Sequence, residues 1–145
     1  MTGRVAIAAG LNWVVAAVMF GVGARYLVST QLMPHHMQIL GVAWTGLTPG
    51  TRTLMLILMK GTGLVGVCTA VSLALLLAVP FRRHEVWSYW AILVVGITAL
   101  VPMLIGAVLV RLETGVAVPW WPHVVLLAAL ALAFALTGQV GGSGR

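Results

Sequence analysis

The sequence predicts an all-α integral membrane protein, a bundle of four transmembrane helices with a short interfacial helix between the first two. Of its 145 residues, 61% are hydrophobic and 7% are charged, whereas about a quarter of the residues of a soluble domain are charged. Four apolar runs reach the roughly 20 residues that a helix needs to cross a bilayer core of about 30 Å. The runs lack the alternation of barrel strands, so each is expected to be a helix.

The four runs fill most of the chain and leave no room for a second domain. We expect one domain over residues 1–145, with spans at about residues 5–28, 51–80, 87–111 and 119–137. A signal peptide is the alternative for the first run. Its length exceeds the roughly 7–15 residues of a typical apolar signal core, so we expect it to remain as a helix.

Small residues recur at helical spacing in every span, and such stripes let helices approach closely in lipid. Pro102 lies inside the third span, where it removes one backbone donor. We expect the stripes to form the contacts between helices. They are Asn12, Ala16, Met19, Gly23 and Tyr26, then Thr62, Gly66, Thr69 and Ala70, then Gly96, Ala99, Met103 and Gly106, and last Ala128, Ala131 and Ala135.

The net charge of +6 does not indicate a nucleic-acid partner, because the basic residues are scattered and form no stripe. Counted by loop, they are nearly balanced between the two sides of the membrane, so the positive-inside rule discriminates weakly. Arg82 and Arg83 stand together in a tight loop. We therefore expect a multi-pass protein of the cell membrane with both termini in the cytoplasm.

The connection from Ser29 to Arg52 is too polar for a span and too apolar for a free linker, which places it on the membrane surface. Pro34 is expected to begin a short helix that Gly41 ends. Thr48 followed by Pro49 is typical of a cap and the first turn of the next helix. A helix that begins there is longer than the hydrocarbon core, so its first turns are expected to stand outside.

Lys60 interrupts the second span and allows two interpretations. Counted about 20 residues back from Pro80, Lys60 lies at the membrane boundary, where its ammonium group reaches water. If the span starts at Thr53 instead, Lys60 lies about 10 Å below the boundary. It is then an intramembrane charge, which indicates a functional site.

Polar side chains gather at the end of the predicted bundle that carries the long connection, and we predict a ligand-binding site there. Cations at such a boundary bind phosphate or carboxylate groups. The alternative is that the cations only anchor helices at the interface. The predicted site has Arg25, Lys60 and Arg111 as cations, Glu113 as their ion-pair partner, His35, His36 and Trp44 lining the lid, and His123 beside them.

The sequence carries no motif for catalysis. Cys68 is the only cysteine, which excludes intrachain disulfides and CxxC sites. Met33, His35, His36 and Met37 carry donors that suit copper(I), but adjacent histidines on a helix point about 100° apart. Haem needs histidines at facing depths within spans, which this chain lacks. We expect no metal site and no catalytic residue, and the sequence identifies no cofactor.

Two segments carry a family resemblance. Residues 80–87 read PFRRHEVW, and residues 111–121 begin RLETG and end PWW. In these segments and in its overall layout, the chain resembles small bacterial four-helix membrane proteins of unknown function, loosely the DoxX-like group. The resemblance implies an inner-membrane subunit, in some cases associated with quinone-linked oxidation. It assigns no role to any particular residue.

Three hypotheses for function follow. The first is a non-catalytic membrane protein that binds an anionic or amphiphilic small molecule or a lipid headgroup at the polar end, within a membrane complex or a homo-oligomer. The second is a small membrane enzyme that uses Glu113 or a histidine as acid or base on a lipid-soluble substrate. The third is a purely structural membrane subunit.

Overall fold

The computed structural model describes residues 3–138, which form five α-helices and two short turns of other helix types. No strand occurs over this part of the chain, so the all-α prediction is confirmed. The helices are α1 (Gly3–Val28), α2 (Pro34–Leu40), α3 (Pro49–Leu76), α4 (Val86–Thr114) and α5 (Trp121–Gly138), with the 3-10 turn η1 (Trp44–Gly46) before α3 and the π turn η2 (Leu77–Phe81) after it.

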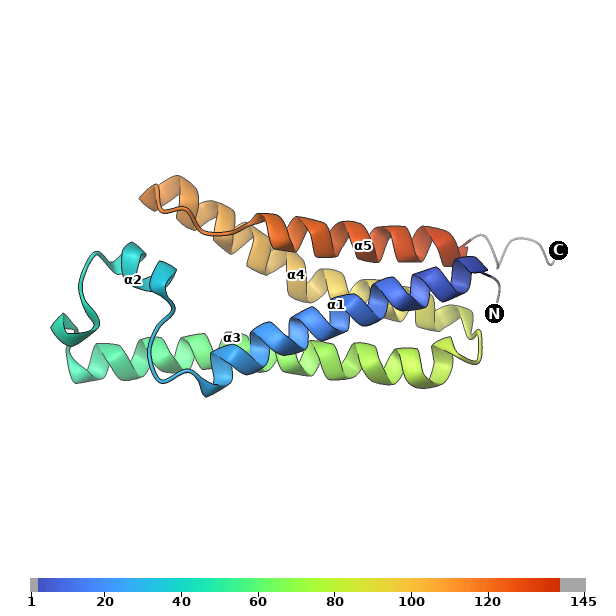
Figure 1. Ribbon diagram of the computed structural model, residues 1–145, viewed down its shortest axis with the longest axis horizontal. Coiled ribbons are helices and arrows are strands. Elements are labelled where there is room, and N and C mark those ends of the chain that lie inside the picture. Colours follow the sequence, from blue (N-terminus) through green and yellow to red (C-terminus); the bar gives the residue numbers. More distant parts are fainter. Residues whose placement is uncertain (1–2, 139–145) are drawn as a thin grey trace.

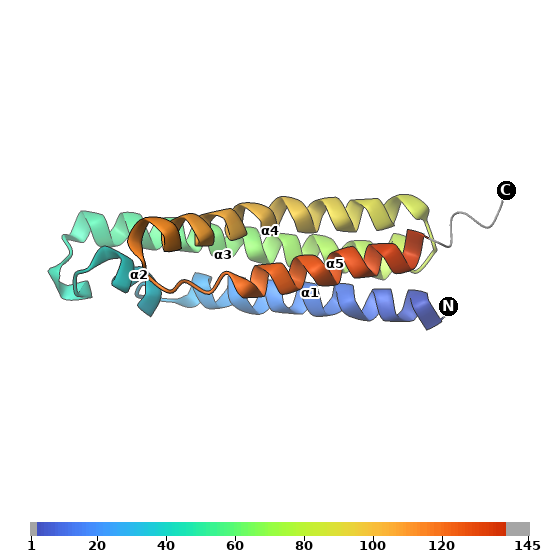
Figure 2. The same ribbon diagram turned by 90° about the horizontal axis from the view of Figure 1, so that it is seen from above.

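The four long helices lie side by side along the long axis of the molecule (Figure 1 and Figure 2). Both α1 and α4 pack against α3 and against α5. The start of α1, the α3–α4 connection and the end of α5 lie together at what we call the turn end (Figure 1). At the opposite end, called the loop end, lie α2, η1 and residues 115–120. The arrangement is a helical bundle with a short helix between its first two long helices.

Three helices have the length and apolar composition to cross a membrane. They are α1 with 26 residues, the continuous helix Pro49–Phe81 with 33 residues, and α4 with 29 residues. The apolar stretch of α5, Trp121–Thr137, is shorter. Three of the four expected spans are thus supported by length and hydropathy, and a crossing by α5 stays a prediction.

The helix ends follow the local signals in the sequence. The Thr48 hydroxyl accepts a hydrogen bond from the Thr51 backbone N–H at 3.3 Å, and Pro49 opens α3. Gly41 ends α2 and Gly115 ends α4, with φ angles of 65° and 70°. This left-handed conformation favours glycine because a side chain is strained there. The predicted short helix and the predicted start of α3 are therefore confirmed.

Small residues bring α1 and α3 together, as their spacing predicts. Gly23 of α1 lies against Gly63 and Gly66 of α3, with no room for a side chain between Gly23 and Gly63. Asn12 and Ala16 are buried on the same face of α1. Closer to the turn end, larger apolar side chains from all four long helices fill the core, and they include Val15, Leu73, Leu100 and Leu130.

The predicted contact stripe of the last helix is wrong. Ala128, Ala131 and Ala135 are exposed. The residues of α5 that are buried are Leu126, Leu130, Ala133 and Thr137. The side chain of Leu130 occupies the space that Gly96 of α4 leaves free. This helix pair therefore fits a large side chain onto a glycine, instead of packing small residues on both sides.

Candidate functional site

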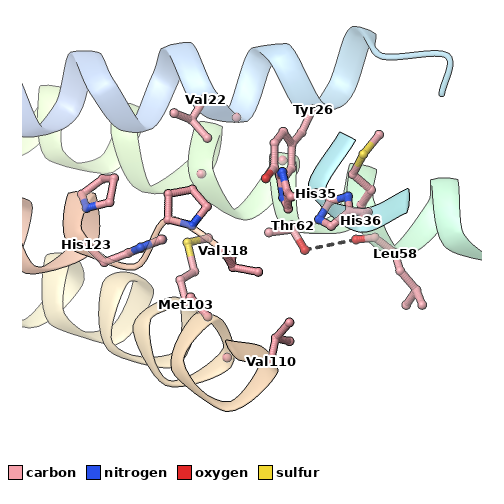
Figure 3. A pocket seen from close by; sticks show the side chains of 18 of the residues that line it. Val22, Tyr26, His35, His36, Leu58, Thr62, Met103, Val110, Val118 and His123 are labelled. Atoms are coloured by element: carbon pink, nitrogen blue, oxygen red, sulfur yellow. Dashed lines mark hydrogen bonds between the residues drawn. The ribbon is translucent and has the colours of Figure 1, made fainter. Parts of the chain in front are cut away.

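A cavity of about 550 Å³ occupies the half of the bundle that faces the loop end (Figure 3). Its walls come from α1, α3 and α4, and α2, residues 118–119 and the first turns of α5 complete it. The deepest part reaches Met19, Gly66, Leu100 and Leu126. Volumes of this size are typical of small-molecule sites.

The wall is mostly apolar, and its polar side chains are uncharged or imidazole. Among residues 3–138, no Asp, Glu, Lys or Arg lines the cavity. The polar members are Tyr26 from α1, His35 and His36 from α2, Thr62 from α3 and His123 from α5. The Thr62 hydroxyl donates to the Leu58 carbonyl oxygen at 3.1 Å (Figure 3). The phenol and the three imidazoles are left as the groups that can meet a ligand.

His35, His36 and Tyr26 form a cluster at the loop end of the cavity. The rings of His35 and His36 lie 4.1 Å apart between centroids, and Tyr26 meets His36 edge to face at 6.0 Å. His123 faces this cluster from α5 across the cavity (Figure 3). A molecule in the cavity therefore meets this cluster at one end, His123 on the facing wall and mostly apolar side chains elsewhere.

Two imidazole nitrogens of the residues that line the cavity have unused hydrogen-bonding capacity. The Nδ1 atoms of His36 and His123 are both buried, and neither has a partner among residues 3–138. Burial lowers the pKa of His35 below its usual 6.5, and burial and the neighbouring His35 together lower the pKa of His36. Both α2 imidazoles are therefore neutral at pH 7, and a neutral imidazole offers one donor and one acceptor.

The predicted charged residues lie outside the cavity. Arg25, Lys60, Arg111 and Glu113 are all exposed, and none of them lines the wall. The expected ion pair is wrong, since Glu113 forms none within the described part of the chain. Arg111 and Glu113 are two positions apart in the last turn of α4, so their side chains point about 200° apart.

The cations lie at two levels along the bundle. The contact between Gly23 and Gly63 puts Arg25 level with Lys60, because both stand within three residues of that crossing. Met103 of α4 lines the cavity together with Thr62 of α3. Arg111 follows Met103 by eight residues, which places it about 12 Å nearer the loop end. The sequence grouped these three cations at one mouth, and the structure separates them.

Trp44 belongs to a lid over the cavity and not to its wall. Leu32, Met33 and Met59 are buried together, and Trp44 packs against them from η1. The Arg52 guanidinium lies 5.6 Å from the centre of the Trp44 ring and donates to the Thr45 carbonyl oxygen at 2.7 Å. We call residues 29–48 the lid. This second apolar cluster holds the lid on the first turns of α3.

The cavity also contains residues that the sequence did not single out as site residues. Met103, Gly106 and Val110 recur at helical spacing on α4, and all three line the wall. Gly106 is exposed, and a Cβ added to it would meet no atom within 4 Å. Over residues 3–138, no three His, Cys, Asp or Glu side chains are close enough to hold a metal ion.

No protein-family model, curated protein sequence or solved structure matches the chain. The resemblance to DoxX-like proteins therefore stays a prediction, and the function has to be argued from the cavity.

Proposed function

We propose that this is an integral protein of the cell membrane that binds a neutral amphiphile in the cavity, a molecule with an apolar chain and a small hydrogen-bonding head. The observation that carries the proposal is the cavity itself, which is apolar along its depth and polar at one end. His36 lines that polar end and His123 lines the facing wall, and the Nδ1 atom of each is buried without a partner among residues 3–138. A buried polar group without a partner costs free energy, which a ligand's head would recover once the imidazole ring turns toward it.

The levels of the cations support this placement in a bilayer. Lys60 lies 21 residues before Phe81, and Arg25 lies 21 residues after Arg4. At 1.5 Å per residue, both intervals are about 30 Å, the thickness of the hydrocarbon core. Lys60 and Arg25 then mark the same boundary, which favours the interpretation in which Lys60 reaches the interface. Tyr26 lies at this boundary, and the floor of the cavity lies in the hydrocarbon.

A neutral head fits the site better than an anionic one. An unpaired ion in an apolar cavity loses its hydration without compensation. The cations that could neutralise an anion, Arg25, Lys60 and Arg111, do not line the wall. Glu113 is exposed in the last turn of α4 and does not line the cavity. Its position therefore does not favour acid–base catalysis on an enclosed substrate. As part of the same proposal, all four long helices cross the membrane and both termini lie in the cytoplasm. The protein also assembles with other subunits.

Twelve-carbon probes test the binding. The protein is placed in phosphatidylcholine nanodiscs and titrated with 12-bromododecan-1-ol. Quenching of tryptophan fluorescence is measured at each concentration. We expect a saturable component that dodecan-1-ol displaces and that dodecyl phosphate displaces only at about tenfold higher concentration, a difference of about 1.4 kcal/mol. The absence of a saturable component would overturn the proposal. A preference for dodecyl phosphate that is lost in Lys60→Met would point to an anion site on the surface instead.

Filling the cavity provides the matched comparison. In Gly106→Phe the new ring enters the cavity, and we expect the affinity for 12-bromododecan-1-ol to fall about tenfold or more. Gly10→Phe adds the same ring to α1, where a Cβ meets nothing within 4 Å and no cavity is lined. The Gly10 variant should bind as the wild type does. If Gly106→Phe folds poorly, Gly106→Leu is the smaller replacement, and unchanged binding in either folded variant contradicts the proposal.

The role of the imidazoles is tested separately from the apolar wall. His36→Phe and His123→Phe keep a ring of similar shape and remove the nitrogens. A hydrogen bond contributes about 0.5–1.5 kcal/mol, so each variant should weaken the binding of dodecan-1-ol by about two- to twelvefold. Displacement by dodecane, which has no head, should stay the same. Equal losses for both probes would mean that the histidines act by shape alone.

A further inference from the structure

A second hollow adjoins the cavity at the seam between α3 and α4. Its six lining residues are Thr62, Val65, Thr98, Ala99, Pro102 and Met103. Thr62 and Met103 line the cavity as well. The two hollows therefore meet at these two side chains, one from each helix of the seam.

The seam faces the surroundings of the bundle with apolar side chains. Val65 lines the second hollow and is exposed, with 49% of its surface accessible, and Val94 and Ile97 of α4 are exposed as well. In a membrane this surface meets lipid. By contrast, the lid covers the cavity toward the loop end, where Leu32 and Met33 are at least nine-tenths buried.

The local structure of α4 allows the seam to open. The contact between α3 and α4 is the least extensive of the four contacts between neighbouring long helices. Pro102 lacks an N–H, so the Thr98 carbonyl receives no helix hydrogen bond from it, and helices bend most readily at such a point. Met103 is unbranched and changes rotamer easily. A small bend with one rotamer change would join the two hollows.

We infer that the α3–α4 seam is a lateral entrance through which the amphiphile passes between the bilayer and the cavity, with Thr62 and Met103 as its gate. This inference rests on the proposed function. A chain-bearing molecule is dissolved in the membrane before it binds, so an entrance on the lipid side spares its chain a passage through water. The head then reaches the histidines at the boundary while the chain remains in hydrocarbon.

Rates of exchange test the entrance, since a gate changes rates without changing affinity. Val65 lines the second hollow and not the cavity, so Val65→Phe narrows the seam and leaves the cavity intact. Stopped-flow quenching by 12-bromododecan-1-ol should show association and dissociation both slowed by about fivefold or more, at an unchanged Kd. Leu64→Phe is the control, because Leu64 is exposed on the same helix and lines neither hollow.

Each other outcome overturns the inference in a distinguishable way. Equal rates in Val65→Phe and Leu64→Phe would show that the seam is not used. A changed Kd at an unchanged association rate would make Val65 part of the binding site and not of an entrance. Faster exchange in Leu32→Ala, together with no effect of Val65→Phe, would place the entrance at the lid. If the wild type shows no saturable quenching, the proposed function fails and the entrance fails with it.

Discussion

Gly23 and Gly63 face each other where α1 crosses α3, at a distance that only glycine permits. A Cβ added to Gly23 would lie 2.6 Å from the Gly63 carbonyl oxygen, and a Cβ added to Gly63 would lie 2.8 Å from the Gly23 carbonyl oxygen. Backbone atoms cannot move aside as a flexible side chain can. The crossing fixes the level of Arg25 against Lys60, and it forms part of the cavity wall.

Gly63→Ala should therefore destabilise the protein. Overpacking of this kind typically costs about 1–3 kcal/mol, although alanine favours a helix over glycine by about 1 kcal/mol. Thermal unfolding in detergent measures the change. Gly61→Ala is the matched control two residues away, where a Cβ meets nothing within 4 Å, and it should be neutral or stabilising. Equal melting temperatures for the two variants would contradict the close crossing.

The contact between Gly96 and Leu130 should behave differently, because here the obstacle is a side chain. A Cβ on Gly96 would overlap the Leu130 Cδ1 atom. Leu130→Ala removes that atom and should cost about 2–5 kcal/mol on its own. We expect Gly96→Ala to destabilise the wild type and to be neutral or stabilising in the Leu130→Ala background. A double-mutant cycle of unfolding free energies measures this coupling, and additive effects would rule the contact out.

The helix ends could be predicted because their causes are local. The length of the apolar runs, the Thr48 cap with Pro49, and Gly41 each act within a few residues. The face of α5 could not be predicted from spacing, since every third or fourth position of an alanine-rich helix forms a stripe. Leu130 is the buried residue because it packs onto Gly96 of another helix. The sequence of α5 alone does not indicate that contact.

The candidate site was predicted only in part, for a related reason. The sequence placed His35, His36 and His123 at one end of the bundle, and the structure makes all three line one cavity, with His123 opposite the other two. Arg25, Lys60 and Arg111 were also predicted as site residues, because charged side chains stand out in an apolar chain. Whether a side chain faces a cavity depends on helix rotation. A change of one position turns a side chain by about 100°, and no local signal fixes that angle.

Arg52 should hold the lid in place through Trp44 and the Thr45 carbonyl. Its guanidinium satisfies a backbone acceptor and covers an aromatic face, so Arg52→Met removes both contacts while keeping an unbranched side chain. We expect amide hydrogen exchange over residues 43–47 to quicken, by about tenfold for a loss near 1.4 kcal/mol. Arg83→Met, on the exposed turn at the other end, should leave this segment unchanged. Unaltered exchange in Arg52→Met would show that the lid is held by its apolar cluster alone.

Acid should weaken the lid because of the two histidines of α2. Burial lowers the pKa of His35 and His36 below the 6.5 that they have in an unfolded chain. As the pH falls through 6.5, the unfolded form takes up protons before the folded form does, so the free energy of unfolding decreases until the lowered folded-state values are passed. At pH values well above 6.5 the imidazoles are neutral in both forms, and stability no longer depends on these groups.

Melting temperatures measured between pH 8 and pH 5 should therefore fall in acid for the wild type and fall less for His36→Gln, which keeps a polar side chain that does not titrate. His84→Gln is the control, since His84 is exposed in the α3–α4 connection at the opposite end of the bundle, and its variant should keep the wild-type profile. The same protonation puts a positive charge on the cavity wall. The affinity for dodecan-1-ol should therefore decline as the pH falls through the lowered folded-state pKa values, and dodecyl phosphate should lose its disadvantage there. A flat profile in the wild type, or one that His84→Gln abolishes, would mean that the α2 histidines are already solvated in the folded protein.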